Sequence, residues 1–348
     1  MDNQITKTPK PSAELKELIE KARNIYDDNF NKDTWFGRCI FLSWYCERGT
    51  CTFCFRSVQK HNIKHPEKAR RSIASILAEA MMIKAFGWRI EFLTGGYGIT
   101  NNKELVRIIK LVSQVLDEKI WVNLGEIGSN LLEEFQPYVK GIISSIETLN
   151  PELHKEVCPD KPIKPFEDMI NISVTMGFKQ GMTIVIGLGE QKDDFKLLDN
   201  FIKRNCIERI TIYALRPVQG TRFTKGPDPL DVAWWVAKTR IANPSIEIIV
   251  GSAHYRIPEL SLLLNAGANA ITKLPATSIF NTKKGLDVEK EVKKANRNFI
   301  SKFSSKNPLE EANWDEMLSR TELSTEEKKE VMNVLKRYLK KFDERKNF

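Results

Sequence analysis

Short apolar runs alternate with longer amphipathic stretches along most of this chain, between about residue 38 and residue 274. The apolar runs carry few charges, as expected of strands that are buried on both faces of a parallel sheet. They occupy residues 38–45, 89–94, 119–124, 141–146, 182–186, 209–215, 246–250 and 269–274. The stretches between them, including residues 69–86, 103–116 and 166–176, have the periodicity of surface helices.

Eight strand–helix units in succession predict an α/β fold, a (β/α)8 barrel of the TIM type. A doubly wound open sheet has the same alternation and is the alternative interpretation. Polar and glycine residues follow strand after strand, and the loops at the carboxyl ends of barrel strands form the active site in such folds. In strand order these residues are the cysteines near residue 50, residues 95–98, Asn123 with Glu126, Glu147, residues 187–190, Arg216 and His254.

Two charged segments flank the predicted barrel. Residues 12–29 form one amphipathic stretch, and residues 283–348 are rich in Lys and Glu. Ser324 followed by Glu327 predicts a helix N-terminus with a capping box. An apolar stripe at helical spacing comes next, at Val331, Val334, Leu335, Tyr338, Leu339 and Phe342, and we interpret it as a packing face. We expect an N-terminal helical segment (1–35), the barrel (36–282) and a C-terminal helical extension (283–348).

Composition narrows the possible functions. The hydrophobic share is 41% of 348 residues, which is ordinary for a globular protein, and no run approaches the ~18 apolar residues of a membrane span. Lys and Arg total 54 against 45 Asp and Glu, but no nucleic-acid-binding module is visible. We therefore expect no membrane or nucleic-acid partner, and the excess of basic residues fits anionic small molecules or solvated lysines. The few cysteines and the absence of a secretory signal predict a cytoplasmic protein rather than a disulfide framework.

Three cysteines lie close together just after the first predicted strand, at Cys46, Cys51 and Cys54. Three thiolates on one short loop can ligate three irons of a [4Fe–4S] cube and leave the fourth iron open. A zinc site is a second interpretation, with His61 or His65 as the fourth ligand. A third is that the cysteines merely pack in the core.

The cysteine loop, with the aromatic Phe53 before its third cysteine, resembles the cluster loop of the radical S-adenosylmethionine (SAM) superfamily, although four residues rather than the usual three separate the first two cysteines. The resemblance implies a [4Fe–4S] cluster and SAM as cofactors, with Cys46, Cys51 and Cys54 as the metal ligands. Gly95 and Gly96 match the position that binds the methionyl amino group of SAM.

Two later segments extend this resemblance. Ser145 and Glu147 match the segment that hydrogen-bonds the SAM ribose, and Glu147 could instead be a loop carboxylate that caps the next turn. Gly187 and Gly189 resemble the glycine-rich turn that flanks the adenine. The resemblance therefore implies SAM contacts on the second, fourth and fifth strands.

Within the superfamily, residues 147–154, 186–190, 216–221 and 264–269 resemble the branch that contains biotin synthase and HydE. Biotin synthase carries a second cluster in its barrel, but the corresponding strands here contain no thiol. We expect Cys39 at the start of the first strand, Cys158 in a loop and Cys206 before the sixth strand, too far apart to converge. Sulfur insertion is therefore not expected.

The widened cysteine gap and the lack of a second cluster ligand set resemble the HmdB (HcgA) subfamily, whose own gap is wider by one more residue. That subfamily is assigned to synthesis of the iron-guanylylpyridinol cofactor of [Fe]-hydrogenase in methanogens. The resemblance implies reductive cleavage of SAM, a ferredoxin-like electron donor and a small-molecule substrate in the barrel lumen. Asn123, Tyr213, Arg216 and His254 are the candidates to bind that substrate. The alternatives are another HydE-like or biotin-synthase-related enzyme of a different cofactor pathway, and a cluster-binding scaffold without radical turnover.

Overall fold

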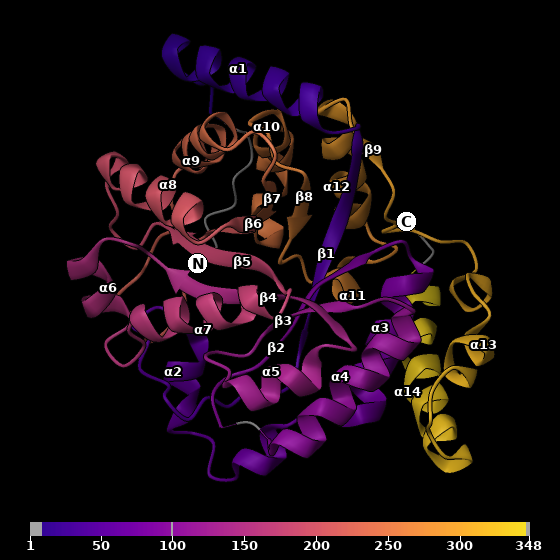
Figure 1. Ribbon diagram of the computed structural model, residues 1–348. Coiled ribbons are helices and arrows are strands. Elements are labelled where there is room, and N and C mark those ends of the chain that lie inside the picture. The colour runs from indigo at the N-terminus through magenta and orange to yellow at the C-terminus, as the bar shows by residue number, and fades with distance from the viewer. Residues whose placement is uncertain (1–8, 99, 346–348) are drawn as a thin grey trace.

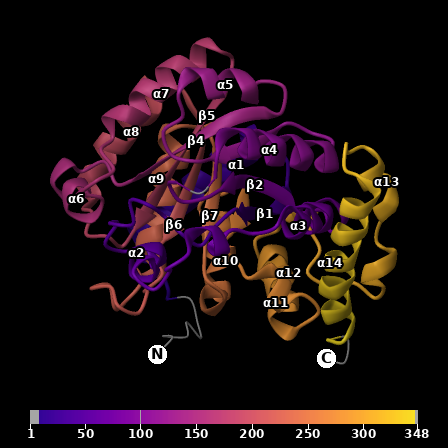
Figure 2. The same cartoon turned by 90° about the horizontal axis from the view of Figure 1, so that it is seen from below.

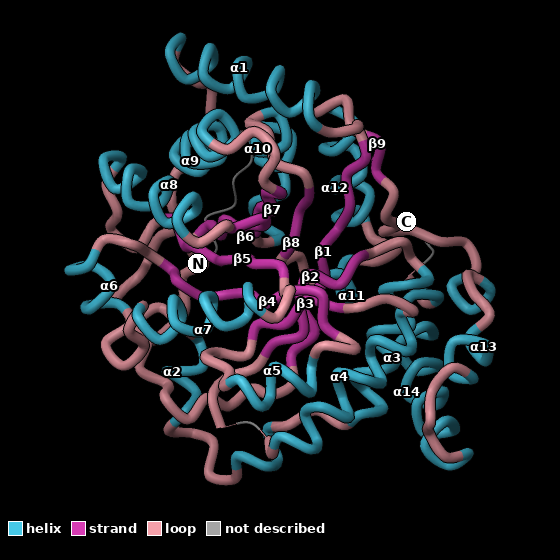
Figure 3. Tube along the Cα trace, viewed as in Figure 1, coloured by secondary structure: helices cyan, strands magenta, loops and turns pink. Residues whose placement is uncertain are grey.

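The computed structural model describes residues 9–98 and 100–345 and shows a closed barrel of eight parallel strands. Strand pairs run in order from β1 to β8, and β8 pairs with β1 to close the ring. The strands gather at the centre of the molecule and the helices surround them (Figures 1 and 3). The predicted TIM-type barrel is confirmed, and the doubly wound open sheet is excluded because its edges would not pair.

Apart from the first, the strands of the barrel have bounds close to those that the apolar runs predict. The strands are β1 (Asp33–Phe41), β2 (Arg89–Thr94), β3 (Ile120–Asn123), β4 (Val139–Glu147), β5 (Lys179–Ile186), β6 (Ile207–Ala214), β7 (Glu247–Gly251), β8 (Ala270–Thr272) and the short β9 (Asn298–Phe299).

The helices form an outer layer. They are α1 (Ala13–Asn29), α2 (Phe55–Lys60), α3 (Ile73–Ala85), α4 (Asn102–Leu116), α5 (Ser129–Phe135), α6 (Pro151–Val157), α7 (Lys164–Thr175), α8 (Phe195–Arg204), α9 (Pro229–Ala242), α10 (Leu260–Asn265), α11 (Ala276–Ile279), α12 (Lys283–Lys294), α13 (Trp314–Ser319) and α14 (Thr325–Asp343). Four 3-10 turns complete the list: η1 (Pro66–Ala69), η2 (Lys192–Asp194), η3 (His254–Glu259) and η4 (Pro308–Glu310). No described helix is both long and apolar enough to cross a bilayer.

The first strand lies earlier in the chain than predicted, at Asp33–Phe41 instead of residues 38–45. Its beginning pairs with β9, a partner more than 250 residues away that no local pattern reveals. Its end is set by Ser43, whose hydroxyl accepts a hydrogen bond from the backbone N–H of Tyr45 at 3.0 Å as the chain bends out of the sheet. The apolar run therefore continues past the strand into the cysteine loop.

The flanking segments pack on the outside of the barrel. Helix α1 lies against α9, and α14 lies against α3. Helices α6 and α14 stand on opposite sides of the barrel in both views (Figures 1 and 2). The capping box of Ser324 and Glu327 is confirmed, and the apolar stripe that follows is buried except for the partly exposed Tyr338. The domain boundaries remain a prediction, and residues 1–8 and 346–348 of the two flanks lie outside the described part of the chain.

A buried arginine ties the barrel together at the amino ends of β7 and β8. Arg240 on α9 is fully buried and donates to the carbonyl oxygen of Gly267 at 3.0 Å and to Oδ1 of Asn269 at 2.6 Å. The same Oδ1 accepts from the backbone N–H of Ile248 at the start of β7. Gly267 has a φ of +101°, and a Cβ there would lie 2.7 Å from the Arg240 side chain. Arg240, Gly267 and Asn269, which we call the latch, thus connect α9 to the end of the barrel opposite the predicted site.

Candidate active site

The predicted site residues lie at one rim of the barrel, the carboxyl ends of the strands. The cysteine loop follows β1, Gly95 and Gly96 follow β2, Asn123 ends β3, Ser145 and Glu147 lie at the end of β4, Gly187 and Gly189 follow β5, Tyr213 lies near the end of β6, Arg216 follows β6, and His254 begins η3 after β7. Residues separated by more than 200 positions in sequence are therefore brought to one face of the fold.

The cysteine loop packs directly on the glycine turn after β2. A Cβ on Gly96 would lie 2.3 Å from the carbonyl oxygen of Tyr45 and 2.6 Å from Cβ of Cys46, so only glycine fits. The backbone N–H of Tyr97 points to Sγ of Cys46 at 3.4 Å, and its carbonyl oxygen accepts from the N–H of Glu47 at 2.9 Å. The two loops therefore form one unit, and Gly96 has a structural role besides the predicted contact with SAM.

Cys158 follows α6, as the loop position predicted for it implies, and lies beside the cysteine loop, a contact that the sequence did not indicate. A hydrogen bond from the Cys158 thiol lowers the pKa of Cys51 to about 7, against the effect of burial. The backbone N–H of Thr52 also donates to the carbonyl oxygen of Val157 at 2.9 Å, which anchors the loop to the end of α6. A thiol with a lowered pKa is more readily available as the thiolate that ligates iron.

A guanidinium supplies positive charge next to the cysteines. Arg56 on α2 donates to the carbonyl oxygen of Ser43 at 3.1 Å, while its buried Nε has no hydrogen-bond partner within the described residues. Burial lowers the pKa of Arg56, and negative charge on Cys54 and Cys46 opposes that effect. Three thiolates with a buried cation and an unsatisfied donor fit an anionic iron–sulfur cluster. Sequence reasoning missed Arg56, although its place two residues after Cys54 was a signal.

The zinc interpretation finds no support in the geometry of the described residues. No three His, Cys, Asp or Glu side chains among residues 9–98 and 100–345 converge as ligands of one metal ion. His61 and His65 are exposed, and Nδ1 of His65 lies 3.2 Å from Glu67. A cube distributes its thiolates over three irons, so its ligands need not converge on one point.

The carboxylate of Glu147 is paired with a buried lysine that the sequence did not single out. Oε1 of Glu147 lies 2.6 Å from Nζ of Lys161, and both side chains are nearly buried. Burial acts to lower the pKa of Lys161, but the negative charges of Glu147, Cys158 and Cys51 together outweigh it and the pKa is raised. Glu147 has a φ of +67°, a strained backbone conformation for a residue with a side chain. The contact between Glu147 and the SAM ribose stays a prediction. One of the two carboxylate oxygens of Glu147 is already paired with Lys161.

The turn after β5 is closed by its own glutamate. The carboxylate of Glu190 accepts from the backbone N–H groups of Gly187 at 2.7 Å, Leu188 at 3.0 Å and Gly189 at 3.1 Å. Burial raises the pKa of Glu190 against these hydrogen bonds. A groove of about 580 Å³ opens beside the turn, with Trp235 on its other wall. The backbone N–H groups of this turn are therefore already hydrogen-bonded to Glu190. An adenine beside the turn would pack against its surface and would not accept hydrogen bonds from these N–H groups.

The four predicted substrate residues differ in their surroundings. Asn123 is buried, and its Oδ1 accepts from the hydroxyl of Ser145 at 2.8 Å. Tyr213 points into the lumen, whereas Arg216 is exposed. The ring of His254 packs edge-on against Tyr255 at 5.7 Å between centroids. Asn123 and Ser145 are thus brought together, while a shared substrate contact for all four residues remains a prediction.

A carboxylate at the bottom of the lumen was not predicted. Glu91 on β2 is fully buried, and the pairing of β1 with β2 steps from Arg38↔Ile90 to Cys39↔Phe92, which leaves Glu91 as the extra residue of a β-bulge. Its two oxygens accept from the side chains of Cys39 at 2.8 Å, Thr211 at 2.9 Å, Tyr213 at 2.8 Å and Thr272. A charged residue within an apolar strand was the available signal.

This cluster corrects the placement of Cys39, which was expected at the start of the first strand. Cys39 lies near the end of β1, inside the barrel, and it is buried. Burial and the adjacent Glu91 raise the pKa of its thiol well above the usual range. A thiol held protonated beside a carboxylate is poorly suited to ligate a metal.

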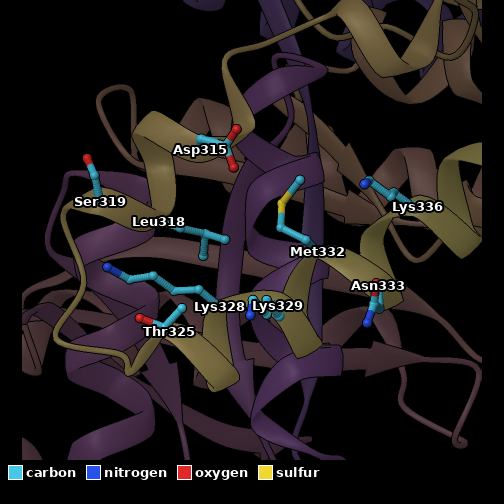
Figure 4. Close-up of a pocket in the computed structure, with 9 residues that line it drawn as sticks. All are labelled: Asp315, Leu318, Ser319, Thr325, Lys328, Lys329, Met332, Asn333 and Lys336. Carbon is cyan, nitrogen blue, oxygen red and sulfur yellow. The ribbon is translucent and has the colours of Figure 1, made fainter.

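The C-terminal helices carry a groove of about 480 Å³ with a basic edge. Figure 4 shows Asp315 and Leu318 of α13 facing Lys328, Lys329 and Met332 of α14 across it. All its lining residues belong to residues 315–336, so it contains none of the predicted site residues. We do not include it in the active site.

Comparison with known families agrees with the iron–sulfur chemistry predicted for the residues at the rim. Residues 42–202 match the model of the radical SAM superfamily, and residues 211–298 match the biotin and thiamin synthesis associated domain. The chain belongs to the radical SAM superfamily. The two matched regions together place it in the biotin synthase and HydE-like branch, and it is a radical SAM enzyme whose cofactors are a [4Fe–4S] cluster and SAM.

Individual proteins extend this comparison. An uncharacterised protein of Methanocaldococcus jannaschii is 35% identical over 83% of this chain and 82% of its own length. The biotin synthase of Methanococcus vannielii is 24% identical over 64% of this chain and 70% of its length.

Two solved structures share the fold. Methylornithine synthase (PylB) covers 76% of this chain and 80% of its own, with a TM-score of 0.65 at 20% identity. The [FeFe]-hydrogenase maturase HydG of Carboxydothermus hydrogenoformans covers 97% and 86%, with a TM-score of 0.66 at 16% identity. Their likeness concerns the fold alone.

Proposed function

We propose that this protein is an HmdB-like radical SAM enzyme in the biosynthesis of the iron-guanylylpyridinol cofactor of [Fe]-hydrogenase, acting in the cytoplasm. The observation that carries the proposal is the cysteine loop itself, with four residues between Cys46 and Cys51 and direct packing on Gly96. The methanogen relative with 35% identity supports it. The lumen supports it too, because Glu91 and its hydroxyl partners fill the floor where sulfur insertion would need thiolates.

When bound, the cluster and SAM supply a 5′-deoxyadenosyl radical, which abstracts hydrogen from a substrate. The protein's own residues hold and shield the reactants. Cys46, Cys51 and Cys54 would ligate the cluster, and Arg56 would balance its charge. Glu147, oriented by Lys161, would accept hydrogen bonds from the ribose.

The electron donor in this proposal is a ferredoxin-like protein that docks beside the cysteine loop. The segment from Lys60 to Arg71 is basic, and Trp44 at the start of the loop is 48% exposed. Basic charge next to the cluster suits an acidic partner, since complementary charge mainly raises the association rate. Lys64→Glu should slow SAM cleavage driven by reduced ferredoxin and leave the rate with dithionite unchanged. Equal slowing with both reductants contradicts this docking site.

Two measurements test the proposed function. Anaerobically reconstituted protein with dithionite should convert SAM to 5′-deoxyadenosine, and its absence would favour a cluster-binding scaffold. A methanogen strain that lacks its HmdB gene should regain the [Fe]-hydrogenase cofactor when it expresses this chain, but not when it expresses the Cys51→Ala variant. SAM cleavage without this rescue would favour another cofactor pathway.

A further inference from the structure

Two described residues other than glycine have a left-handed backbone at the end of a barrel strand. They are Glu147, the last residue of β4, and Lys273, which follows β8, with φ values of +67° and +65°. The other non-glycine residues with positive φ are Asp117, Cys206, Asn281 and Asn296, which follow helices, where this conformation is the ordinary way to end a helix. Strain of this kind lowers stability and concentrates at functional sites.

The backbone of Lys273 turns its side chain toward the lumen. Side chains alternate between the two faces of a strand, and Thr272 already faces inward, where its hydroxyl contacts Glu91. A regular strand would therefore send Lys273 outward. Instead its Nζ lies 4.8 Å from the ring centroid of Tyr213 and 5.1 Å from that of Phe41, at the mouth of the barrel.

The ammonium group of Lys273 has no carboxylate partner within residues 9–98 and 100–345. No described Asp or Glu lies within 4.0 Å of its Nζ, and the side chain is exposed to solvent. The carboxylate deeper in the lumen, Glu91, already accepts four hydrogen bonds. Aromatic rings attract an exposed cation only weakly, so Phe41 and Tyr213 position the ammonium group without replacing an anionic partner.

The position of Lys273 complements that of Glu147. In the ring of eight strands β8 lies four places from β4, so the two strained residues stand on opposite sides of the rim. If Glu147 holds SAM on one side, a ligand held by Lys273 lies across the lumen from it. That arrangement leaves the centre of the barrel for the reaction between them.

We propose that Lys273 binds a carboxylate of the second substrate while Phe41 and Tyr213 contact its apolar body. The substrate class is thus a small organic acid with a flat or apolar carbon frame. This inference rests on the proposed function as a radical SAM enzyme, and it specifies the substrate that the enzyme takes. None of the sequence patterns pointed to Lys273, because one lysine after a short strand looks like an ordinary loop residue.

The experiment compares two probes of the same shape, phenylacetate and the neutral phenylacetamide, with the reconstituted holoenzyme in the presence of SAM. Saturation-transfer NMR measures their dissociation constants. Phenylacetate should bind the wild type more tightly than phenylacetamide. Lys273→Met should weaken the binding of phenylacetate about ten- to a hundredfold, which corresponds to the loss of one charge-assisted hydrogen bond. It should leave the dissociation constant of phenylacetamide unchanged. Lys273→Arg should restore most of the difference.

Lys203→Met provides the matched control, since Lys203 is an exposed lysine on α8 at the outside of the barrel. It should leave the binding of both probes unchanged. Equal binding of phenylacetate to wild type and Lys273→Met overturns the inference. Loss of SAM affinity in Lys273→Met with phenylacetate binding retained also overturns it, because Lys273 would then belong to the cofactor site. Formation of 5′-deoxyadenosine by the wild type is measured separately, so failure of the proposed function is distinguished from failure of this inference.

Discussion

The floor of the lumen satisfies its buried carboxylate completely, whereas two cationic side chains at the rim have no anionic partner among the described residues. On the floor, Glu91 is fully buried and both its oxygens are satisfied by side chains from β1, β6 and β8. At the rim, the Nε of Arg56 is buried without a partner in the described part of the chain, and Lys273 has an exposed ammonium group. Buried polar groups are nearly always hydrogen-bonded, so unsatisfied ones call for a specific explanation.

This difference indicates which region stabilises the fold and which region awaits a ligand. A satisfied network joins strands and makes the barrel rigid. The buried, unpartnered Nε of Arg56 beside the cysteines suits an anionic cluster, and the exposed ammonium group of Lys273 at the mouth of the barrel suits an anionic substrate. Substitutions of rim residues predicted to hold ligands should therefore change ligand binding. Substitutions on the floor, or of a rim carboxylate that is hydrogen-bonded within its own turn such as Glu190, should change the free energy of unfolding.

The largest effect is expected at the cysteines. Cys46→Ala, Cys51→Ala and Cys54→Ala should each abolish SAM cleavage, because each removes one of three cluster ligands. Iron content should fall from about four per chain in the wild type, as measured by iron analysis and absorbance after anaerobic reconstitution. Cys206 is an exposed cysteine after α8, so Cys206→Ala is the control and should keep both the iron content and the activity of the wild type. A loss with Cys206→Ala as large as with Cys51→Ala would refute the ligand assignment.

Glu91→Ala tests the floor. It should lower the free energy of unfolding by about 3 kcal/mol, because the side chains of four donors lose their acceptor in a buried site. Urea unfolding of the protein without cluster measures this. Glu208→Ala, which removes an exposed carboxylate paired with Lys179, should change stability by less than about 1 kcal/mol. An unchanged free energy of unfolding in Glu91→Ala, together with loss of cluster assembly, would contradict the structural role assigned to the floor.

Glu147→Gln tests the rim at β4. Charge-assisted hydrogen bonds are each worth roughly 1.5–3 kcal/mol, so SAM affinity should fall about ten- to a hundredfold if the carboxylate holds the ribose. The cluster should still assemble, because the cysteine loop follows a different strand. Titration of SAM into reconstituted protein gives the dissociation constants, with Glu152→Gln on the exposed face of α6 as the control. Unchanged affinity would leave Glu147 with only its pairing to Lys161.

The smallest effect is expected for Glu190→Gln. The amide keeps one acceptor oxygen for the turn after β5 but loses the charge that strengthens three backbone hydrogen bonds. Stability should fall by about 1 kcal/mol and be measurable as a shift of the unfolding midpoint in urea. A fall in SAM affinity larger than that of Glu147→Gln would show that this turn contributes more to SAM binding than β4 does.

Local periodicity was sufficient to predict the barrel, since strands buried on both faces and surface helices leave distinct patterns. It could not predict that Asp33 and Thr34 pair with β9, because that partner lies at the far end of the chain. Short motifs were sufficient to place the cysteine loop and the glycine turn on one rim. The fit of Gly96 against Cys46 required the structure, because it depends on how two loops approach each other.

Charge pairing was the least predictable part of the site. Lys161 pairs with Glu147 across 14 residues of loop and helix, and nothing in the spacing of the two residues signals it. The bulge at Glu91 likewise depends on the register between two strands. Cys158 shows the same limit, since its approach to Cys51 follows from where α6 ends.

The latch of Arg240, Gly267 and Asn269 has a consequence for how relatives of this protein are recognised. The segment 264–269 is among the features that tie the sequence to the biotin synthase branch, yet it lies at the end of the barrel away from the chemistry. Residues at that end of such barrels serve stability, while the loops at the other end diversify. Similarity in this segment therefore groups enzymes by the shared ancestry of their barrels. The reaction of each enzyme must instead be assigned from the residues at its rim.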